Sequence, residues 1–123
     1  MREAGLSQNP ASDQVVQFVL RLCADSTESA DDLWDGLQHI AAHTHHERGC
    51  SACAVELNSD WTVRFTEEWT TERDMQRPMR SDLFRAILEL IEQSAQKPNV
   101  EFDVGVMVRD LDYAQQVKIG ALG

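Results

Sequence analysis

Two stretches decide the fold: TEEW at residues 66–69, which ends an alternation of apolar and polar residues, and MRSDLF at residues 79–84, which opens a run with helical periodicity. A strand that ends on an aromatic residue is thus followed by a short polar helix and then by a longer apolar one. This order predicts a small α+β domain with an apolar cavity between sheet and helix. It locates a pocket better than it identifies a reaction.

The same two periodicities extend outward along the chain. Alternation predicts strands at residues 14–22, 50–57, 61–69 and 100–108. Apolar residues at three- and four-residue steps predict helices that open at Ser29, Thr71 and Ser81. The predicted helix ends are Gly49, Pro78 and residues 97–99.

The predicted order βαββαβ is typical of a ferredoxin-like arrangement, an antiparallel sheet with its helices on one face. In the first strand Val16, Phe18, Leu20 and Leu22 share a face, and in the last Phe102, Val104, Val106 and Val108 do. The second face of the sheet then needs cover, and a homodimer is the simplest cover.

Length and charge exclude several classes of protein. With 123 residues the chain is long enough for one core, and it has no apolar run long enough to cross a bilayer. A formal charge of −10 repels a phosphate backbone, so we expect no nucleic-acid partner and no membrane. Residues 1–13 are polar without an apolar signal region, which predicts a flexible leader and a cytoplasmic protein.

The C-terminal segment has the weakest pattern. We expect the domain at residues 14–109 and a tail at residues 110–123. Tyr113, Val117 and Ile119 could pack on a partner subunit or fray, and the sequence leaves both alternatives open.

Three local motifs, in this order, resemble the antibiotic biosynthesis monooxygenase family of dimeric α+β barrels. They are ERGC at residues 47–50, Glu67 two residues before Trp69, and RSDLF at residues 80–84. The resemblance covers roughly residues 14–108. It implies a dimer of half-barrels and, in the family's enzymes, a pocket that oxidises electron-rich phenols, anthrones or quinols with molecular oxygen.

The resemblance implies no metal, flavin or haem. A deprotonated substrate of this kind itself reduces oxygen, so the protein need supply only a base, a dry cavity and stabilisation of the enolate. Leu88 occupies the helix position at which haem-degrading relatives present a histidine. One departure concerns Pro78, which stands where many members carry a histidine nine residues after the strand-ending aromatic. Proline cannot transfer a proton.

Glu67 and Trp69 are the predicted catalytic residues. By alternation they share the helix-covered face with Val63 and Phe65, and a carboxyl there should have a raised pKa suited to a general base. The alternative is that Glu67 is bonded to backbone or paired with an arginine, and that Trp69 belongs to the core.

The predicted substrate-binding residues are apolar and flank the expected cavity: Phe18, Phe65, Met79 and Phe84. Each could equally be core. Arg64 alternates onto the opposite face, where we expect it to pair with an acidic residue.

Two metal-like patterns have simpler interpretations. His39, His43 and His46 have ligand-like spacing, but they lie opposite the apolar stripe and should face solvent, so we expect no metal site. Cys50 and Cys53 match C-x-x-C, but they begin a strand and should point to opposite faces, so a structural role is expected.

The sequence therefore favours a homodimeric, cofactor-independent monooxygenase acting on an aromatic, anthrone or quinol-like molecule. The alternative is a non-catalytic member of the same fold that binds a small ligand or has a filled pocket.

Overall fold

The computed structural model describes residues 16–104, 107–118 and 120. The predicted leader and residues 14 and 15 of the first strand lie outside this range. The elements are β2 (Val16–Cys23), α3 (Thr27–Thr44), β3 (Cys50–Leu57), β4 (Thr62–Trp69), α4 (Glu72–Gln76), the 3-10 helix η1 (Pro78–Arg80), α5 (Asp82–Glu92), β5 (Asn99–Val104), β6 (Met107–Arg109) and α6 (Leu111–Lys118). Among them, no helix has the length and apolar character that a membrane crossing requires.

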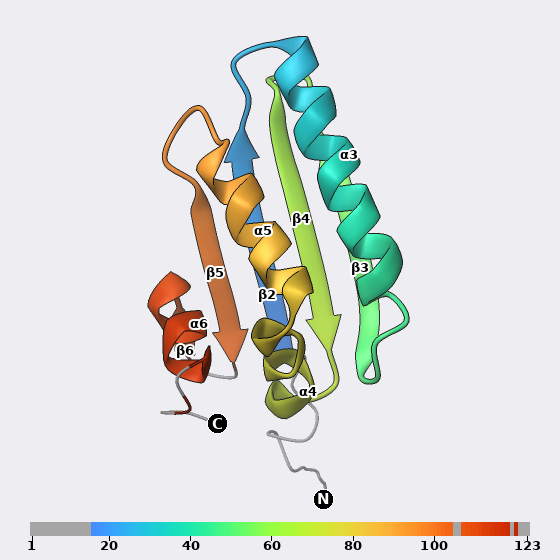
Figure 1. Cartoon of the computed structure of the whole chain (residues 1–123), viewed down its shortest axis with the longest axis vertical. Helices are drawn as coiled ribbons and strands as arrows, with labels where there is room; N and C mark the ends of the chain where they lie inside the picture. Colours follow the sequence, from blue (N-terminus) through green and yellow to red (C-terminus); the bar gives the residue numbers. More distant parts are fainter. Residues whose placement is uncertain (1–15, 105–106, 119, 121–123) are drawn as a thin grey trace, which may run out of the picture.

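The strands form one antiparallel sheet in the order β3-β4-β2-β5-β6, and α3 and α5 lie across one of its faces (Figure 1). The first four strands in sequence have the ferredoxin-like order, which confirms the predicted α+β class. β2 and β4 are central, and their full-length pairing from Val16↔Trp69 to Cys23↔Thr62 places the end of β4 beside the start of β2.

Alternation sets the two faces of the central strands. In β4 every second residue from Val63 to Trp69 is buried and the others are half-buried. In β2, Phe18, Leu20 and Leu22 are buried on the helix side while Arg21 is exposed. The predicted faces of both strands are confirmed, and the core lies between this face and the helices.

The first helix begins and ends earlier than predicted. Ser26 caps α3, because its hydroxyl accepts a hydrogen bond from the Ser29 N–H at 3.0 Å, so the predicted start at Ser29 is wrong. The helix ends at Thr44, five residues before Gly49. Gly49 has φ +89° and instead turns the chain into β3.

The segment between β4 and α5 follows the prediction closely. The hydroxyl of Thr71 caps α4, Pro78 ends it and starts η1, and the hydroxyl of Ser81 accepts from the Leu83 N–H to cap α5. Proline, which cannot continue a helix, separates α4 from η1, and the cap Ser81 separates η1 from α5. This places Met75 and Met79 on consecutive turns above the sheet.

The predicted single strand at residues 100–108 is wrong beyond Val104. β5 and β6 are two strands of a hairpin, paired from Phe102↔Arg109 to Val104↔Met107. Val108 is therefore 64% exposed and not on the buried face of Phe102, and Val106 lies outside the described residues. A period of two is satisfied equally by one long strand and by two short paired ones, so alternation alone could not separate them.

The C-terminal segment packs on its own subunit. α6 buries Tyr113, Ala114 and Val117 in the same core as the sheet, and it contacts η1 and β5. Tyr113 and Val117 therefore neither fray nor remain exposed to pack on a partner subunit, as the sequence had left open. Ile119 lies outside the described residues.

The sheet face without helices is polar. Arg21 and Arg64 are direct cross-strand neighbours on its two central strands, two residues from the Cys23↔Thr62 end of their pairing. Gln17 lies toward the other end, beside Glu68 and Asp103 on the adjacent strands. As predicted, Arg64 pairs with an acidic residue: its Nη1 lies 3.7 Å from Glu56 Oε1.

Gly49 and Gly120 give a matched test of local packing, because both have positive φ. A Cβ on Gly49 would lie 2.6 Å from Asp74 Cβ and closer still to the Asp74 carboxyl, whereas a Cβ on Gly120 would meet nothing within 4 Å. We expect Gly49→Ala to lower the free energy of unfolding by about 3 kcal/mol, because the strained backbone adds to the displacement of Asp74 from Arg77. Gly120→Ala should cost about 1 kcal/mol. Urea unfolding measures both, and equal losses would contradict this packing.

Candidate active site

Glu67 and Trp69 lie together on the buried face at the end of β4. Glu67 is 6% exposed and Trp69 is fully buried. The indole Nε1–H of Trp69 donates a hydrogen bond of 2.9 Å to Glu67 Oε1. Residues two apart on a strand point the same way, so the strand itself holds the donor and the carboxyl in register.

Burial makes the Glu67 carboxyl an unusually weak acid. Removal from water raises the pKa of Glu67 to about 7, although the hydrogen bond from Trp69 acts in the opposite direction. In the described part of the chain, the bond to this carboxyl comes from an indole and not from backbone or arginine. The alternative interpretation, in which Glu67 is bonded to backbone or paired with an arginine, is therefore wrong. The pKa of Glu67 is raised, as predicted.

A small cavity borders the Glu67 carboxyl. Its volume of about 10 Å³ is close to the minimum for one water molecule and far below the several hundred Å³ of a typical ligand site. The lining residues come from the sheet and from α3, α4, η1 and α5: Phe18, Thr44, Glu67, Met75, Pro78, Met79, Leu83, Phe84, Ile87 and Phe102.

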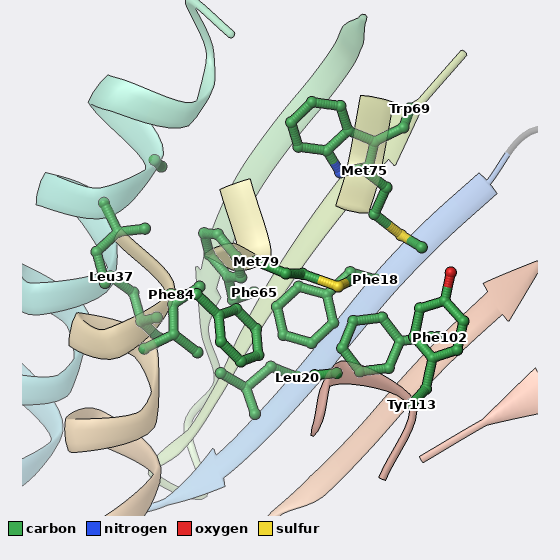
Figure 2. Close-up of a cluster of buried hydrophobic side chains, with 14 of the residues drawn as sticks. Phe18, Leu20, Leu37, Phe65, Trp69, Met75, Met79, Phe84, Phe102 and Tyr113 are labelled. Carbon is green, nitrogen blue, oxygen red and sulfur yellow. The ribbon is translucent and has the colours of Figure 1, made fainter. Parts of the chain in front are cut away.

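Three of the four predicted substrate-binding residues, Phe18, Met79 and Phe84, line this cavity. Phe65 does not. Its ring instead packs edge-on against Phe18, with the ring centroids 6.0 Å apart. Figure 2 shows these aromatic rings gathered between the strands and α5, with the Met79 side chain among them.

Phe102 and Met75 also line the cavity, although neither was predicted to bind substrate. Phe102 stacks on Phe18 with ring centroids 4.7 Å apart and planes at 17°, and the two rings together form the aromatic floor of the cavity on its sheet side (Figure 2). The place of Phe102 on the buried face of its strand was predicted. The pairing of β5 with β2, which brings Phe102 beside Phe18, is a long-range contact that the strand pattern does not encode. Met75 lies one helical turn before Met79, and that spacing was the available signal.

Pro78 lines the cavity at the position where the resemblance places a histidine. It therefore contributes an apolar surface and no proton donor. In this chain Glu67 is the titratable side chain among the residues that line the cavity.

The two cysteines of the C-x-x-C motif lie on one face, so the predicted opposite orientation is wrong. A β-bulge between Cys50 and Ala52 adds one residue to the edge strand, which pairs Cys50 with Trp69 and Cys53 with Glu67. Burial, with the nearby Glu67 charge, raises the pKa of the Cys50 thiol above its usual value. The same two causes raise the pKa of Cys53 to about 12. Both thiols are free and protonated at neutral pH, which agrees with a structural role.

The histidine face of α3 is solvated, as predicted. His39, His43 and His46 are exposed, and the rings of His39 and His43 lie 4.9 Å apart. Over the residues that the structure describes, no group of histidine, cysteine, aspartate and glutamate side chains is arranged to hold a metal ion.

Comparison with known proteins supports the fold. No protein-family model and no curated protein sequence matches the chain. Solved structures do match, among them a conserved protein from Methanosarcina mazei, with 19% identity, a TM-score of 0.64, and coverage of 75% of this chain and 93% of that one.

Two further structures carry an enzymatic description. An antibiotic biosynthesis monooxygenase has 15% identity and a TM-score of 0.60, covering 77% of this chain and 96% of its own. A candidate antibiotic biosynthesis monooxygenase from Deinococcus radiodurans has 23% identity and a TM-score of 0.61, covering 72% and 89%. At these identities the likeness establishes that the chain has the fold of these proteins.

Proposed function

We propose that this protein is a cofactor-independent monooxygenase that oxidises an aromatic, anthrone or quinol-like molecule with molecular oxygen. The observation that carries the proposal is the buried Glu67 carboxyl beside an apolar, aromatic-lined cavity, with a pKa of about 7. A base needs a pKa near the working pH, because it must be ionised and still bind a proton strongly.

Glu67 is the general base in this proposal and Trp69 is its positioning residue. The indole N–H holds Oε1, so Oε2 is the oxygen that takes the proton from the substrate. The same N–H stabilises the carboxylate before the transfer and fixes the carboxyl rotamer during it. The stacked rings of Phe18 and Phe102 give a flat substrate a surface of matching shape.

The substrate supplies the electrons. Loss of a proton to Glu67 leaves a carbanion or phenolate, which transfers electrons to O₂ and forms a carbon–oxygen bond to give a peroxide. Loss of water from the peroxide at a methylene carbon leaves a carbonyl, so that CH₂ and O₂ become C=O and H₂O. The proton held by Glu67 leaves with that water, and the base is regenerated.

The cavity has to enlarge for such a substrate. Met75 and Met79 cover it from α4 and η1, and unbranched thioether side chains can adopt new rotamers at low cost. A planar ligand would then lie on the floor formed by Phe18 and Phe102, with its acidic C–H or O–H group toward Glu67.

A homodimer over the polar sheet face is part of the proposal. Arg21 and Arg64 lie toward one end of the central strands on that face, and Glu68 and Asp103 lie toward the other end. A second copy related by a two-fold axis can bring its acidic end onto this arginine pair, which complements the charge of both copies. Light scattering on the purified chain tests this point, and a monomer at micromolar concentration would contradict it.

A second candidate is a non-catalytic protein that binds a small apolar ligand. Pro78 favours it, because it stands in place of the histidine and cannot transfer a proton. The cavity of about 10 Å³ is too small for such a ligand unless it enlarges, and as it stands it favours a non-catalytic protein whose pocket is filled by its own side chains. In the ligand-binding case Glu67 would accept a hydrogen bond from the ligand and transfer no proton.

Oxygen consumption by the chelator-treated protein, with a panel of anthrones and quinols, distinguishes the two candidates. We expect uptake above the uncatalysed rate with at least one compound. Binding of the panel without uptake would favour the non-catalytic candidate. If no compound of the panel binds and none is oxidised, both candidates are contradicted.

A further inference from the structure

The C-terminal helix lies against the segment that covers the cavity. Figure 1 shows α6 at the same end of the molecule as α4, and α6 contacts η1 directly. Its buried residues Tyr113, Ala114 and Val117 belong to the main core. This helix therefore fixes the position of neighbouring elements and does not merely end the chain.

Tyr113 joins the two elements through a polar cluster. Its hydroxyl donates to Glu72 Oε2 at 2.5 Å and accepts from Gln76 Nε2 at 2.9 Å. Gln76 Nε2 also lies 3.4 Å from Glu72 Oε2. Burial and the hydrogen bond to the Glu72 carboxylate raise the pKa of Tyr113, so its hydroxyl keeps the proton that it donates.

The cluster holds a segment that is unstable alone. α4 has five residues and η1 three, and helices this short do not persist without tertiary contacts. Gln76 is 7% exposed, so a change that separates it from Tyr113 takes away the shorter of the two hydrogen bonds of a buried amide. Met75, next to Gln76, lines the cavity together with Pro78 and Met79 of the same segment.

The Tyr113 ring is fixed from the other side as well. It packs on Phe102, with centroids 5.1 Å apart, and the Arg109 guanidinium lies 5.4 Å from its centroid. Arg109 Nη2 also donates to Gln116 Oε1 at 3.2 Å. Phe102 lines the cavity, so Tyr113 contacts both its floor and the segment that covers it (Figure 2).

We propose that Tyr113 is a latch that controls entry of a planar apolar molecule to the cavity at Glu67: the cavity admits such a ligand when α4 and η1 move away from α6, and that movement breaks both hydrogen bonds of the Tyr113 hydroxyl. The identity of the ligand rests on the proposed function. The opening itself does not.

Hydrogen exchange of backbone amides in Tyr113→Phe tests the latch without any substrate. The substitution keeps the ring on Phe102 and removes the hydroxyl. We expect the Met75 and Arg77 amides, which bond to Thr71 and Arg73, to exchange roughly tenfold faster, while amides of β2 and β4 change less than twofold. Gln115→Ala, at an exposed position of α6, is the matched control and should change neither set.

A neutral fluorescent probe, N-phenyl-1-naphthylamine, provides the second measurement. Its association rate should rise roughly tenfold in Tyr113→Phe and remain raised when Glu67→Gln is added, because opening precedes contact with Glu67. An unchanged association rate, unchanged α4 exchange, or an equal rise of exchange in every element would each overturn the latch. Since neither measurement involves turnover, a protein that consumes no oxygen can still show the latch, and the reverse also holds.

Discussion

Glu67→Gln lowers the rate of substrate-dependent oxygen uptake by roughly 10²- to 10⁴-fold, the range that one general base contributes. Glutamine has nearly the shape of glutamate and its carbonyl oxygen can still accept the hydrogen bond from Trp69 Nε1–H, so the site stays folded. It cannot take a proton from the substrate. The loss should therefore appear in kcat and leave the affinity for a planar ligand within a few-fold.

The matched control is Glu89→Gln, which removes an exposed carboxyl from α5 and the same unit of charge. Its uptake rate should equal that of the unsubstituted protein. The wild-type rate should also rise with pH up to about 7, as Glu67 ionises. A Glu67→Gln protein that keeps more than a tenth of the wild-type rate would show that another group, or solvent, removes the proton.

The second large effect is on stability against pH. The pKa of Glu67 is about 7 in the folded chain and near 4.5 when the carboxyl is in water. Between these values the folded state binds the proton and the unfolded state releases it, so the stability contributed by neutral Glu67 is complete below pH 4.5 and falls as the pH rises to 7. The loss is about 3 kcal/mol, since one pKa unit corresponds to about 1.4 kcal/mol.

Urea unfolding of wild type and Glu67→Gln at several pH values isolates this contribution. Other carboxyl groups titrate in both proteins, so the difference between the two proteins reports Glu67. We expect Glu67→Gln to gain about 3 kcal/mol relative to wild type between pH 4.5 and pH 7, and no further gain above pH 8. A difference that does not vary with pH would mean that Glu67 has an ordinary pKa.

Most of the sheet could be predicted because burial imposes a period of two. In β4 the alternation from Val63 to Trp69 leaves one register in which the apolar side chains face the helices, and Glu67 then has to face them too. The helix caps Thr71 and Ser81 could also be predicted, because a hydroxyl before a helical run accepts hydrogen bonds from the free N–H groups of the first turn.

The failures come from local features that a period does not encode. The bulge between Cys50 and Ala52 reverses the alternation of β3, so two cysteines predicted on opposite faces share one. The hairpin that divides residues 100–108 keeps the period of two within each short strand, but it pairs Val108 with Asp103 and so places Val108 on the face opposite Phe102. The cap was placed at Ser29 and not at Ser26 because a serine precedes the apolar stripe at both positions. Only the extended backbone of Ser26 identifies it as the cap.

The site was predicted in composition and not in volume. Phe18, Met79 and Phe84 line the same cavity as Glu67, but side-chain types cannot tell whether they leave room for a ligand or fill the space themselves. The role of α6 was missed because Tyr113, one aromatic residue in a weakly patterned segment, acquires its meaning from Glu72 and Gln76, some forty residues away in sequence.

The most direct test of the central claim is a carbon-13 NMR titration of the Glu67 side-chain carboxyl, assigned by its disappearance in Glu67→Gln. We predict a midpoint near pH 7, with the Trp69 indole N–H resonance shifting over the same range because it donates to that carboxyl. A midpoint near pH 4.5 would contradict the account, since Glu67 would then be an ordinary carboxylate and too weak a base for the proposed proton transfer.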